Sequence, residues 1–374
     1  TIEGFRKLLT LTEALKVQYD LSKVVFGLEP TANYHKPLGE HLIRCGHQLV
    51  LVSASAVKNN RSLLDCRWDK HDTKDAANVA DLIAQGKCLY YEYPDPKVQD
   101  LRNLLSLKRR LKKEEHGLRV RIRNQLLAQY FPEMDRHFGP SPVSLAVVGR
   151  CLDPARIAGT EFDEFRRNIV PGKLTLAQQK RLQVIWQLAP DSIGCRVGDA
   201  VPFEANVLVS GFQQVRETIK KMENKIEDLC MQFPEYPCLL SIPGFGPDVS
   251  SKVLAAISYP FRFTNGRQVL KMAGFDLCAN RSGKTSNSAT PVISKQGKAD
   301  LRYALYQAAL IASLSNKDFM TYFTNKLRGR QREKGIGTKM RVKLAAKLLV
   351  IAWTLMKKKE PFDPTYLQKG DIQV

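Results

Sequence analysis

Long apolar runs and paired cysteines are missing from this sequence. No apolar stretch is long enough to cross a bilayer, and the longest one near the end, residues 344–356, is interrupted by Lys347. The eight cysteines are scattered, and the absence of any Cys-x-x-Cys pair argues against a zinc cluster. A disulfide framework is equally unexpected in a chain of this size without a visible signal peptide. We therefore expect a cytoplasmic protein with reduced, mostly buried thiols and no membrane partner.

Acidic residues are too few to balance the basic ones. The 374 residues include 58 Lys and Arg but only 37 Asp and Glu, which gives a formal net charge of +21. So large a basic excess predicts a polyanionic partner. Because no segment spans a membrane, nucleic acid is favoured over an anionic membrane surface. The length allows two or three domains with sizeable cores.

The first hundred residues alternate between strand-like and helix-like segments. Residues 23–28 and 48–52 are typical of short buried strands, and residues 34–45 and 76–85 of helices. A further helix is expected over residues 4–17. Strand and helix in alternation predict an α/β fold with a parallel sheet.

The middle of the chain predicts two long helices. The first covers residues 101–129 and ends before Pro132. The second carries apolar residues in steps of four and three from Leu208 to Phe233, which is a heptad pattern. This pattern fits an internal hairpin with the first helix, or a coiled coil that dimerises two chains. Residues 141–202, between the two helices, indicate no function.

The last third of the chain is expected to be mainly helical, with helices over residues 249–257 and 298–313 and around residues 343–353. The segment PGFGP at residues 243–247 precedes the first of them. It resembles the turn of helix-hairpin-helix modules, in which Gly244 and Gly246 would let backbone N–H groups approach a phosphate. The alternative is a tight turn between two helices.

Three acidic residues form a candidate metal site. Glu29 follows a predicted strand, where open α/β sheets place their ligands, and Asp72 and Asp75 share one face of a helix start. Three converging carboxylates would hold Mg²⁺. In the alternative interpretation Asp72 is a helix N-cap, Asp75 favours the first turn of the helix, and Glu29 is an exposed strand end.

Ser282 is a candidate nucleophile because it stands between Arg281 and Lys284, which could steady charge on an attacked phosphodiester. Ser286 and Ser288 compete with it, and serine and glycine are also ordinary loop residues. No histidine follows His137, so the base that activates Ser282 would come from elsewhere, such as a metal site in the first domain.

Basic residues are dense in two segments, the predicted helix over residues 101–129 and the tail over residues 326–359. Together with residues near Ser282 and in the PGFGP turn, they supply the candidate nucleic-acid contacts. A solvated charged face is the alternative for one such helix. Aromatic residues near the second segment are more typical of core than of base stacking. Besides Arg281, Lys284, Gly244 and Gly246, the candidate contacts are Lys108, Arg109, Arg110, Lys112, Arg119, Arg123, Lys295, Arg302, Arg328 and Arg330.

Several segments together resemble the DEDD transposases of the insertion-sequence one-ten family, which also includes the pilin-gene invertases. Each motif is weak by itself, and their order is specific. The motifs are VFGLEPTANY at residues 25–34, LVLVSASAVK at 49–58, KHDTKDA at 70–76, IPGFG at 242–246, RSG at 281–283 and KQGKADLR at 295–302.

The resemblance implies a fold and a site. Residues 1–98 would form a RuvC-like domain of the ribonuclease H fold, in which four acidic residues bind Mg²⁺. Glu29, Asp72 and Asp75 match the second, third and fourth of these residues. The first is an aspartate on a strand that would precede Thr1, so we expect this domain to be incomplete at its start. Residues 99–235 would be the basic helix and coiled-coil region, with an insertion at 141–202, and residues 236–374 the transposase domain.

The resemblance also implies a reaction and partners. Ser282 matches the family's nucleophilic serine, which attacks DNA and forms a transient phosphoserine link. Members assemble as homo-oligomers, dimers or tetramers, through a coiled coil. A structured noncoding RNA, the bridge RNA, pairs with donor and target DNA. The source would be bacterial or archaeal.

Two other functions stay open on the residues alone. A RuvC-like endonuclease would use metal and water, and Ser282 would then be dispensable. A non-catalytic DNA- or RNA-binding protein would keep the fold without the chemistry.

Overall fold

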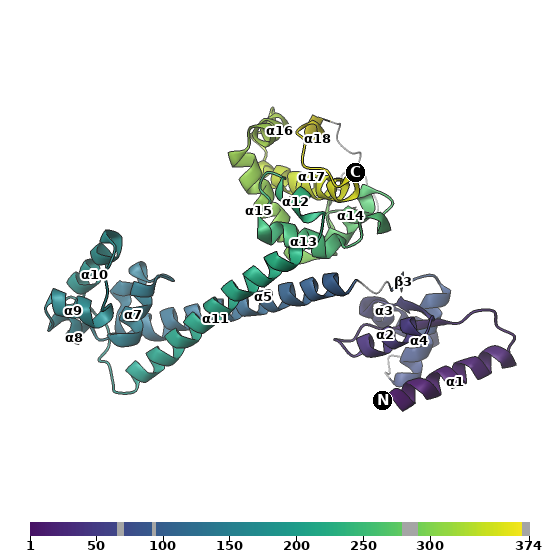
Figure 1. Cartoon of the computed structure of the whole chain (residues 1–374), viewed down its shortest axis with the longest axis horizontal. Coiled ribbons are helices and arrows are strands. Elements are labelled where there is room, and N and C mark those ends of the chain that lie inside the picture. Colours follow the sequence, from purple (N-terminus) through teal and green to yellow (C-terminus); the bar gives the residue numbers. More distant parts are fainter. Residues whose placement is uncertain (66–70, 92–94, 279–290, 369–374) are drawn as a thin grey trace. The chain divides into compact units, whose positions relative to one another are not determined.

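The computed structural model describes residues 1–65, 71–91, 95–278 and 291–368. The chain divides into two compact units, Thr1–Asp95 and Pro96–Val374. Helices predominate in the described residues, and the strands are short (Figure 1). No helix in the described part of the chain combines the length and the apolar character needed to span a membrane.

The first unit is a small α/β layer. β1 and β2 pair in parallel, with Val25 opposite Gln48, as the alternating pattern predicts. β3 joins β2 in the antiparallel direction, which was not predicted because its two residues are exposed and show no periodicity. In chain order the unit contains α1 (Ile2–Gln18), β1 (Val25–Leu28), α2 (His35–Arg44), β2 (Gln48–Leu51), α3 (Ala54–Asp65), α4 (Asp72–Ala84) and β3 (Leu89–Tyr90).

Helix α4 packs directly on β1 because Gly27 has no side chain. A Cβ at Gly27 would lie 2.1 Å from Cδ1 of Ile83 and 3.1 Å from a methyl carbon of Val79. The interface between α4 and α3 is polar and buried: Asn78 donates to the backbone oxygen of Val57 at 2.7 Å and accepts from Asn60 at 2.9 Å. The later turns of α4 therefore pack on both the sheet and α3.

The second unit is almost wholly helical. Its elements up to the second long helix are α5 (Pro96–Arg121), η1 (Ile122–Leu127), α6 (Ala128–Tyr130), η2 (Pro132–His137), α7 (Pro142–Arg150), α8 (Pro154–Ala158), α9 (Phe162–Ile169), α10 (Leu176–Leu188) and α11 (Val201–Cys230). The rest are α12 (Tyr236–Leu240), α13 (Pro247–Ile257), η3 (Pro260–Arg262), α14 (Gly266–Ala273), β4 (Leu277–Cys278), β5 (Val292–Ile293), α15 (Ala299–Ser315), α16 (Lys317–Leu327), α17 (Ile336–Lys358) and α18 (Thr365–Gln368).

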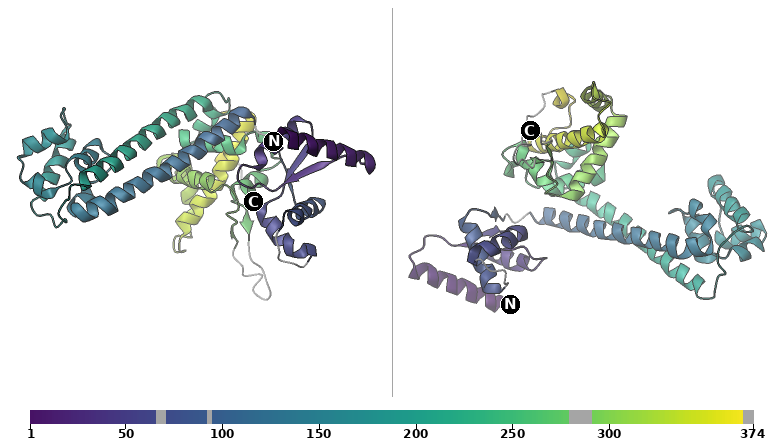
Figure 2. Two further views of the ribbon diagram at one scale, coloured as in Figure 1. Left: turned by 90° about the horizontal axis from the view of Figure 1, so that it is seen from below. Right: turned by 180° about the vertical axis from the view of Figure 1, so that it is seen from behind.

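Helices α5 and α11 lie side by side in opposite directions (Figures 1 and 2). Lys108 of α5 contacts Glu223 of α11 at 2.9 Å. Further along α5, Glu115 contacts Arg216, which lies earlier in α11, at 3.4 Å, so the two helices run antiparallel. The heptad seam of α11, including Phe212 and Ile219, is buried. The hairpin interpretation of the heptads is therefore confirmed, since the chain's own α5 packs against α11.

Residues 141–202 fold into a helical subdomain with its own core. Helices α7 to α10 gather around buried residues that include Phe131, Phe165 and Ile185, and the first turns of α11 complete this core. Polar and glycine-rich connections interrupt the helical periodicity, which is why the sequence predicts only mixed structure there.

The last part of the second unit forms a larger core. It is built on α17, whose Leu348, Leu349 and Ala352 are fully buried, with α13, α14 and α15 packed around it. The helices predicted at residues 249–257, 298–313 and 343–353 are all confirmed, and each extends further than predicted.

The cysteine expectation was partly wrong. The seven cysteines in the described residues are all free, but only Cys230 and Cys238 are buried. Cys45 ends α2, Cys195 lies in a loop and Cys278 belongs to an exposed strand, so these three stay accessible. The exposed thiols therefore lie at a helix end, in a loop and on an exposed strand, and not on buried apolar faces.

Candidate functional site

The three carboxylates predicted to bind a metal lie in the first unit. Glu29 directly follows β1, and Asp72 and Asp75 occupy the first turn of α4. The N-cap role considered for Asp72 is wrong, because the N-cap is His71, whose Nδ1 accepts from the backbone N–H of Lys74 at 3.2 Å. Asp75 is held by Arg61 of α3, which donates from Nε at 3.0 Å and from a terminal nitrogen at 2.8 Å.

The predicted nucleophile Ser282 lies outside the described residues, as do Arg281 and Lys284. The chain on either side of them is well anchored. β4 and β5 pair antiparallel, with Cys278 opposite Val292. Just beyond β5, the backbone N–H of Ser294 donates to the carbonyl of Asp276 at 2.7 Å.

The PGFGP turn connects α12 to α13. Gly244 has a φ of +88°, and a Cβ there would lie 2.4 Å from the backbone oxygen of Ala308 in α15. Packing against α15 therefore explains this glycine by itself. Gly246 faces open space, but Pro247 removes one backbone donor and Asp248 adds a negative charge in the first turn of α13. Both features weaken the expected phosphate contact at this helix start.

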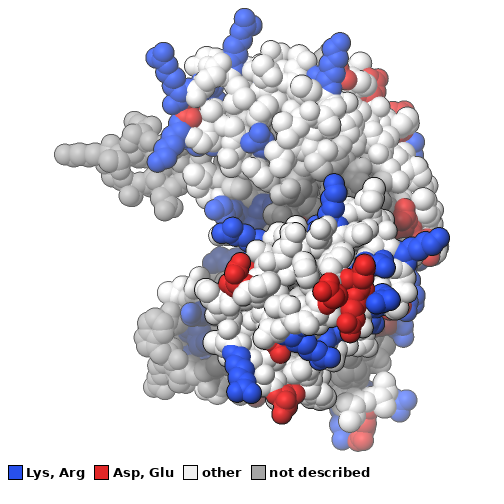
Figure 3. All heavy atoms as spheres, turned by 90° about the vertical axis from the view of Figure 1, so that its left-hand side faces the viewer, with Lys and Arg blue, Asp and Glu red and all other residues white. Residues whose placement is uncertain are grey.

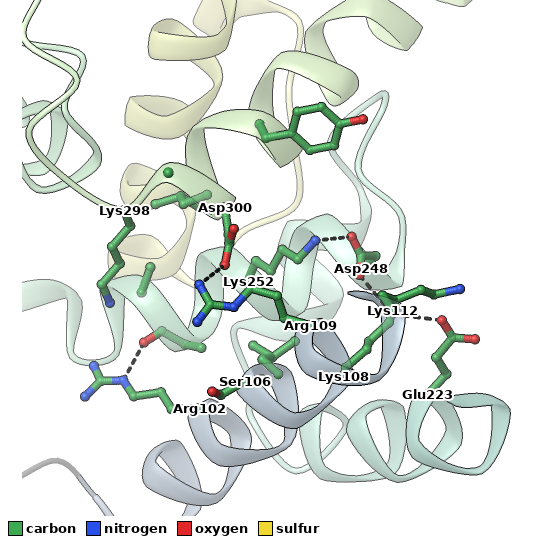
Figure 4. A pocket seen from close by; sticks show the side chains of 16 residues that line it. Arg102, Ser106, Lys108, Arg109, Lys112, Glu223, Asp248, Lys252, Lys298 and Asp300 are labelled. Atoms are coloured by element: carbon green, nitrogen blue, oxygen red, sulfur yellow. Dashed lines mark hydrogen bonds and ion pairs between the residues drawn. The ribbon is translucent and has the colours of Figure 1, made fainter. Parts of the chain in front are cut away.

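A groove of about 700 Å³ opens between α5, α11, α13 and the start of α15, all within the second unit (Figure 4). Six basic and three acidic residues line it. Asp248 accepts from Lys252 at 2.6 Å and from Lys108 at 2.9 Å, and Asp300 accepts from Arg109 at 3.0 Å. Each acidic residue of the groove thus has a basic partner, and basic residues remain in excess.

Family models match both ends of the chain. A model for DEDD transposases of the IS110 kind, described as a transposase, matches residues 1–132, and a model described as "Transposase IS116/IS110/IS902 family" matches residues 236–324. The chain belongs to this transposase family. It is accordingly an enzyme that acts as a DNA transposase or recombinase. No curated protein matches the chain.

A divalent metal ion is typical of DEDD transposases, so the acidic residues of this transposase can be tested for fit. Within the described residues, no three His, Cys, Asp or Glu side chains stand close enough to share a metal ion. The guanidinium of Arg61 already occupies the carboxylate of Asp75. Glu29, Asp72 and Asp75 as arranged therefore do not form a metal site, and no chemical step is assigned to a metal on the basis of this arrangement.

Several basic residues predicted to contact nucleic acid are occupied inside the transposase. Lys108 is only 14% exposed and contacts both Glu223 and Asp248. Burial alone would lower the pKa of Lys108, but the hydrogen bonds that it donates to these two carboxylates outweigh burial and leave the pKa raised. Lys108 thus ties α5 to α11 and α13, and its nucleic-acid contact stays a prediction. Its partners lie on other helices, so no local pattern could have shown this.

Other predicted contacts also have partners. Each of the following pairs joins a predicted contact to an acceptor in the chain: Lys112 to Glu115, Arg109 to Asp300, Arg123 to Asp135, Arg302 to the backbone oxygen of Ala273, and Arg330 to Glu333. Exposed ion pairs of this kind contribute little free energy, so their side chains readily leave one another for solvent. The predicted contacts that are exposed and have no hydrogen bond or ion pair of their side chains within the described ranges are Arg110, Arg119, Lys295 and Arg328.

Three basic residues of the groove were missed by the sequence analysis: Arg102, Lys252 and Lys298. Lys298 falls inside the KQGKADLR motif, so the motif itself was the available signal. The expectation that aromatic residues near the second basic segment are mostly core was only partly right. Phe319 is buried, but Tyr303 is 67% exposed at the groove.

On the face of the molecule drawn in Figure 3, the basic residues do not form one continuous patch. Basic side chains stand apart from one another there, with acidic side chains among them. A nucleic acid would therefore find its strongest contacts where basic residues converge without acidic partners, rather than over the whole of this face.

Proposed function

We propose that this transposase cuts and rejoins DNA through a covalent link to Ser282. The observation that carries the proposal is the family match over residues 236–324, which spans Ser282 and its flanking Arg281 and Lys284. The serine oxygen would attack a DNA phosphorus, and the bond from phosphorus to one DNA oxygen would break. Arg281 and Lys284 would stabilise the charge that develops on the phosphate oxygens.

The link is an intermediate and not a product. The DNA oxygen that leaves takes up a proton, and the proton of Ser282 goes to a base. A hydroxyl of a second DNA strand then attacks the phosphoserine, which frees Ser282 and rejoins DNA without net hydrolysis. Because no histidine follows His137, the base must come from another kind of residue or from residues before position 138.

The acidic residues of the first unit belong to the same proposal. The family resemblance implies that Glu29, Asp72 and Asp75 of a RuvC-like domain with the ribonuclease H fold would hold Mg²⁺, although the described arrangement does not form that site. A bound Mg²⁺ would lower the pKa of an attacking hydroxyl and stabilise a leaving oxygen. The arrangement described above must change for this to happen, since Asp75 has to exchange Arg61 for the metal.

The proposed partners are donor and target DNA, a structured noncoding guide RNA and further copies of the chain, in the cytoplasm of a bacterial or archaeal host. The net charge of +21 supports nucleic-acid partners. A dimer or tetramer built through a coiled coil would use outward faces of α5 and α11, because the heptad seam of α11 is already buried.

The test uses full-length protein with Mg²⁺, DNA of the mobile element and its flanking RNA, analysed on a denaturing gel. Wild type should form a protein–DNA adduct, and Ser282→Ala should form none. The matched controls, Ser286→Ala and Ser288→Ala, should keep it. Chelation of the metal should abolish the adduct, and omission of the RNA should abolish recombination.

Two outcomes would replace the proposal. Cleavage without an adduct, unaffected by Ser282→Ala, would identify a nuclease that uses metal and water. DNA binding with neither cleavage nor adduct would identify a non-catalytic binding protein.

A further inference from the structure

Two aromatic side chains, Tyr259 and Phe261, are exposed next to each other just after α13. Tyr259 is 57% exposed and Phe261 is 55% exposed. Their ring centroids lie 5.5 Å apart, and the two rings are inclined at 47°. Single apolar residues are common on protein surfaces, whereas two aromatic rings in contact form a contiguous apolar patch, which is the more informative observation. These two residues are called the aromatic pair below.

The backbone that carries the aromatic pair is fixed to α17. Trp353 donates from Nε1 to the backbone oxygen of Pro260 at 2.8 Å, and Lys357 donates to that of Phe263 at 3.2 Å. Pro260 and Phe263 are themselves buried, so the turn is held by its inner residues while the aromatic pair stays outside. A rigid turn of this kind lowers the entropy that is lost when a ligand binds to its exposed rings.

The residue before the aromatic pair has a strained backbone. Ser258, at the end of α13, has a φ of +58° and a ψ of −106°, a conformation that costs free energy for a residue with a side chain. Its backbone N–H still donates to the carbonyl of Leu254 at 2.8 Å. Strained residues of this kind gather at functional sites, and here the strain lies directly beside the exposed rings.

The surroundings of the aromatic pair are basic. Residues 258–273 contain three basic residues, Arg262, Arg267 and Lys271, and no acidic one. The ammonium group of Lys357 lies over the ring of Phe261, 5.5 Å from its centroid. Exposed rings among cations are typical of proteins that bind single-stranded nucleic acid, in which bases stack on the rings and phosphates contact the cations.

We propose that the aromatic pair stacks with unpaired bases of the DNA substrate during strand exchange. When a strand is transferred from one duplex to another, its bases leave their old complement before they pair with a new one. Bases inside a duplex are already stacked on one another and leave no face for the rings. DNA is chosen over RNA because this transposase acts on DNA, whereas guidance by RNA is itself a proposal.

The angle between the rings predicts how many bases are held. A flat base can lie parallel to only one of two rings that are inclined at 47°, so each ring would take a base of its own. Loss of one ring should therefore weaken binding about tenfold, and loss of both about a hundredfold. The inference goes beyond the chemistry proposed for Ser282 and does not depend on it.

The experiment measures binding of the full-length protein to one oligodeoxynucleotide of mixed sequence, as a single strand and as a duplex. Tyr259→Ala and Phe261→Ala should each bind the single strand about tenfold more weakly, with duplex binding unchanged. Phe261→Trp should keep the affinity for the single strand because it keeps a ring. Phe261→Leu should lose it, although leucine is also apolar.

Three further readouts separate stacking from charge and from folding. The slope of log affinity against log salt should be the same for wild type and Phe261→Ala, because no phosphate contact is lost. A fluorescent adenine analogue in the single strand should be quenched by wild type and much less by Phe261→Leu, because quenching requires stacking on a ring. The melting temperature of Phe261→Ala should stay close to that of wild type, since the side chain is exposed.

The matched control is Phe203→Ala, which removes an aromatic side chain that is 75% exposed near the start of α11. It should leave the binding of both forms of DNA close to wild type. Ser282→Ala should also bind the single strand normally, so failure of the serine proposal would be visible separately as loss of the adduct only.

Four results would overturn the inference. The first is a single-strand affinity of Phe261→Ala equal to that of Phe203→Ala, and the second is an equal loss for duplex and single strand. The third is a loss confined to single-stranded RNA of the same sequence, which would assign the aromatic pair to RNA. The fourth is unchanged DNA binding with loss of self-association in sedimentation, which would assign the pair to a contact between copies of the chain.

Discussion

Two glycines of the PGFGP turn differ in what surrounds them, and this difference gives a matched pair of substitutions. Gly244→Ala forces a Cβ to within 2.4 Å of the backbone of Ala308 at a φ of +88°. The free energy of unfolding should fall by roughly 2–4 kcal/mol in denaturant titrations. Gly246→Ala meets open space and should change it by less than about 1 kcal/mol. Equal effects of the two substitutions would contradict the packing role of Gly244.

The charge of Lys298 predicts a pH dependence of stability. Its pKa is about 8 in the folded chain, below the ordinary 10.5, so the unfolded chain binds more protons between these values. The destabilisation is full below pH 8 and is relieved as the pH rises toward 10.5. Lys298→Met removes this charge, so its melting temperature should exceed that of wild type at pH 7, and the difference should shrink toward pH 10. An advantage independent of pH would mean that the charge is not its cause.

Single residues show where sequence patterns stop being informative. The types and order of residues in the KHDTKDA and KQGKADLR motifs were enough to find the family, and α4 and α15 begin within these motifs. Lys108 was predicted as a nucleic-acid contact because it stands in a basic run. Its partner Asp248 is 140 positions away, and only the packing of α5 against α13 brings the two together.

The antiparallel pair of α5 and α11 predicts how the heptad seam responds to substitution. Ile219→Ala removes a side chain that is 3% exposed and should lower the free energy of unfolding by about 2–5 kcal/mol. The control Lys220→Ala changes the exposed neighbour and should have little effect. Because α5 of the same chain covers the seam, the destabilisation caused by Ile219→Ala should be the same at every protein concentration. A destabilisation that depends on protein concentration would instead indicate a seam between two chains.

Elements with long apolar periodicity were predicted well, and short or polar elements were not. α11 and α17 carry many buried apolar residues at helical spacing. α3 was missed because it buries little apolar surface and meets α4 through asparagines such as Asn60 and Asn78. The helices between residues 141 and 202 are short, and their core is assembled from separate elements.

Over the whole molecule, the net charge overstates the number of cations that can meet DNA. Arg110 and Arg119 of α5 are exposed and have no partner among the described residues, whereas Arg123 is held by Asp135 at 2.6 Å. Alanine at both Arg110 and Arg119 should reduce the slope of log affinity against log salt by about two. Arg123→Ala should change the slope by much less. If each of the three arginines reduced the slope of log affinity against log salt equally, internal ion pairing would not decide which arginines contact DNA.

The family and the enzyme class followed from motif order, but the site did not follow from motifs alone. Glu29, Asp72 and Asp75 were predicted to converge, and in the described residues they do not share a metal-sized cluster. The positions of these carboxylates at a strand end and a helix start predict which face of the fold they occupy. They do not predict which other side chains of the protein bind them. Arg61, which holds Asp75, comes from the unpredicted α3.

The most direct test of covalent recombination identifies the residue that carries DNA. The adduct is trapped, the DNA is trimmed with nuclease, and the protein is digested with trypsin for mass spectrometry. Trypsin cuts after Lys284 and so separates Ser282 from Ser286 and Ser288. The account predicts a nucleotide on the peptide that ends at Lys284. A nucleotide on the following peptide, or on no serine, would contradict it.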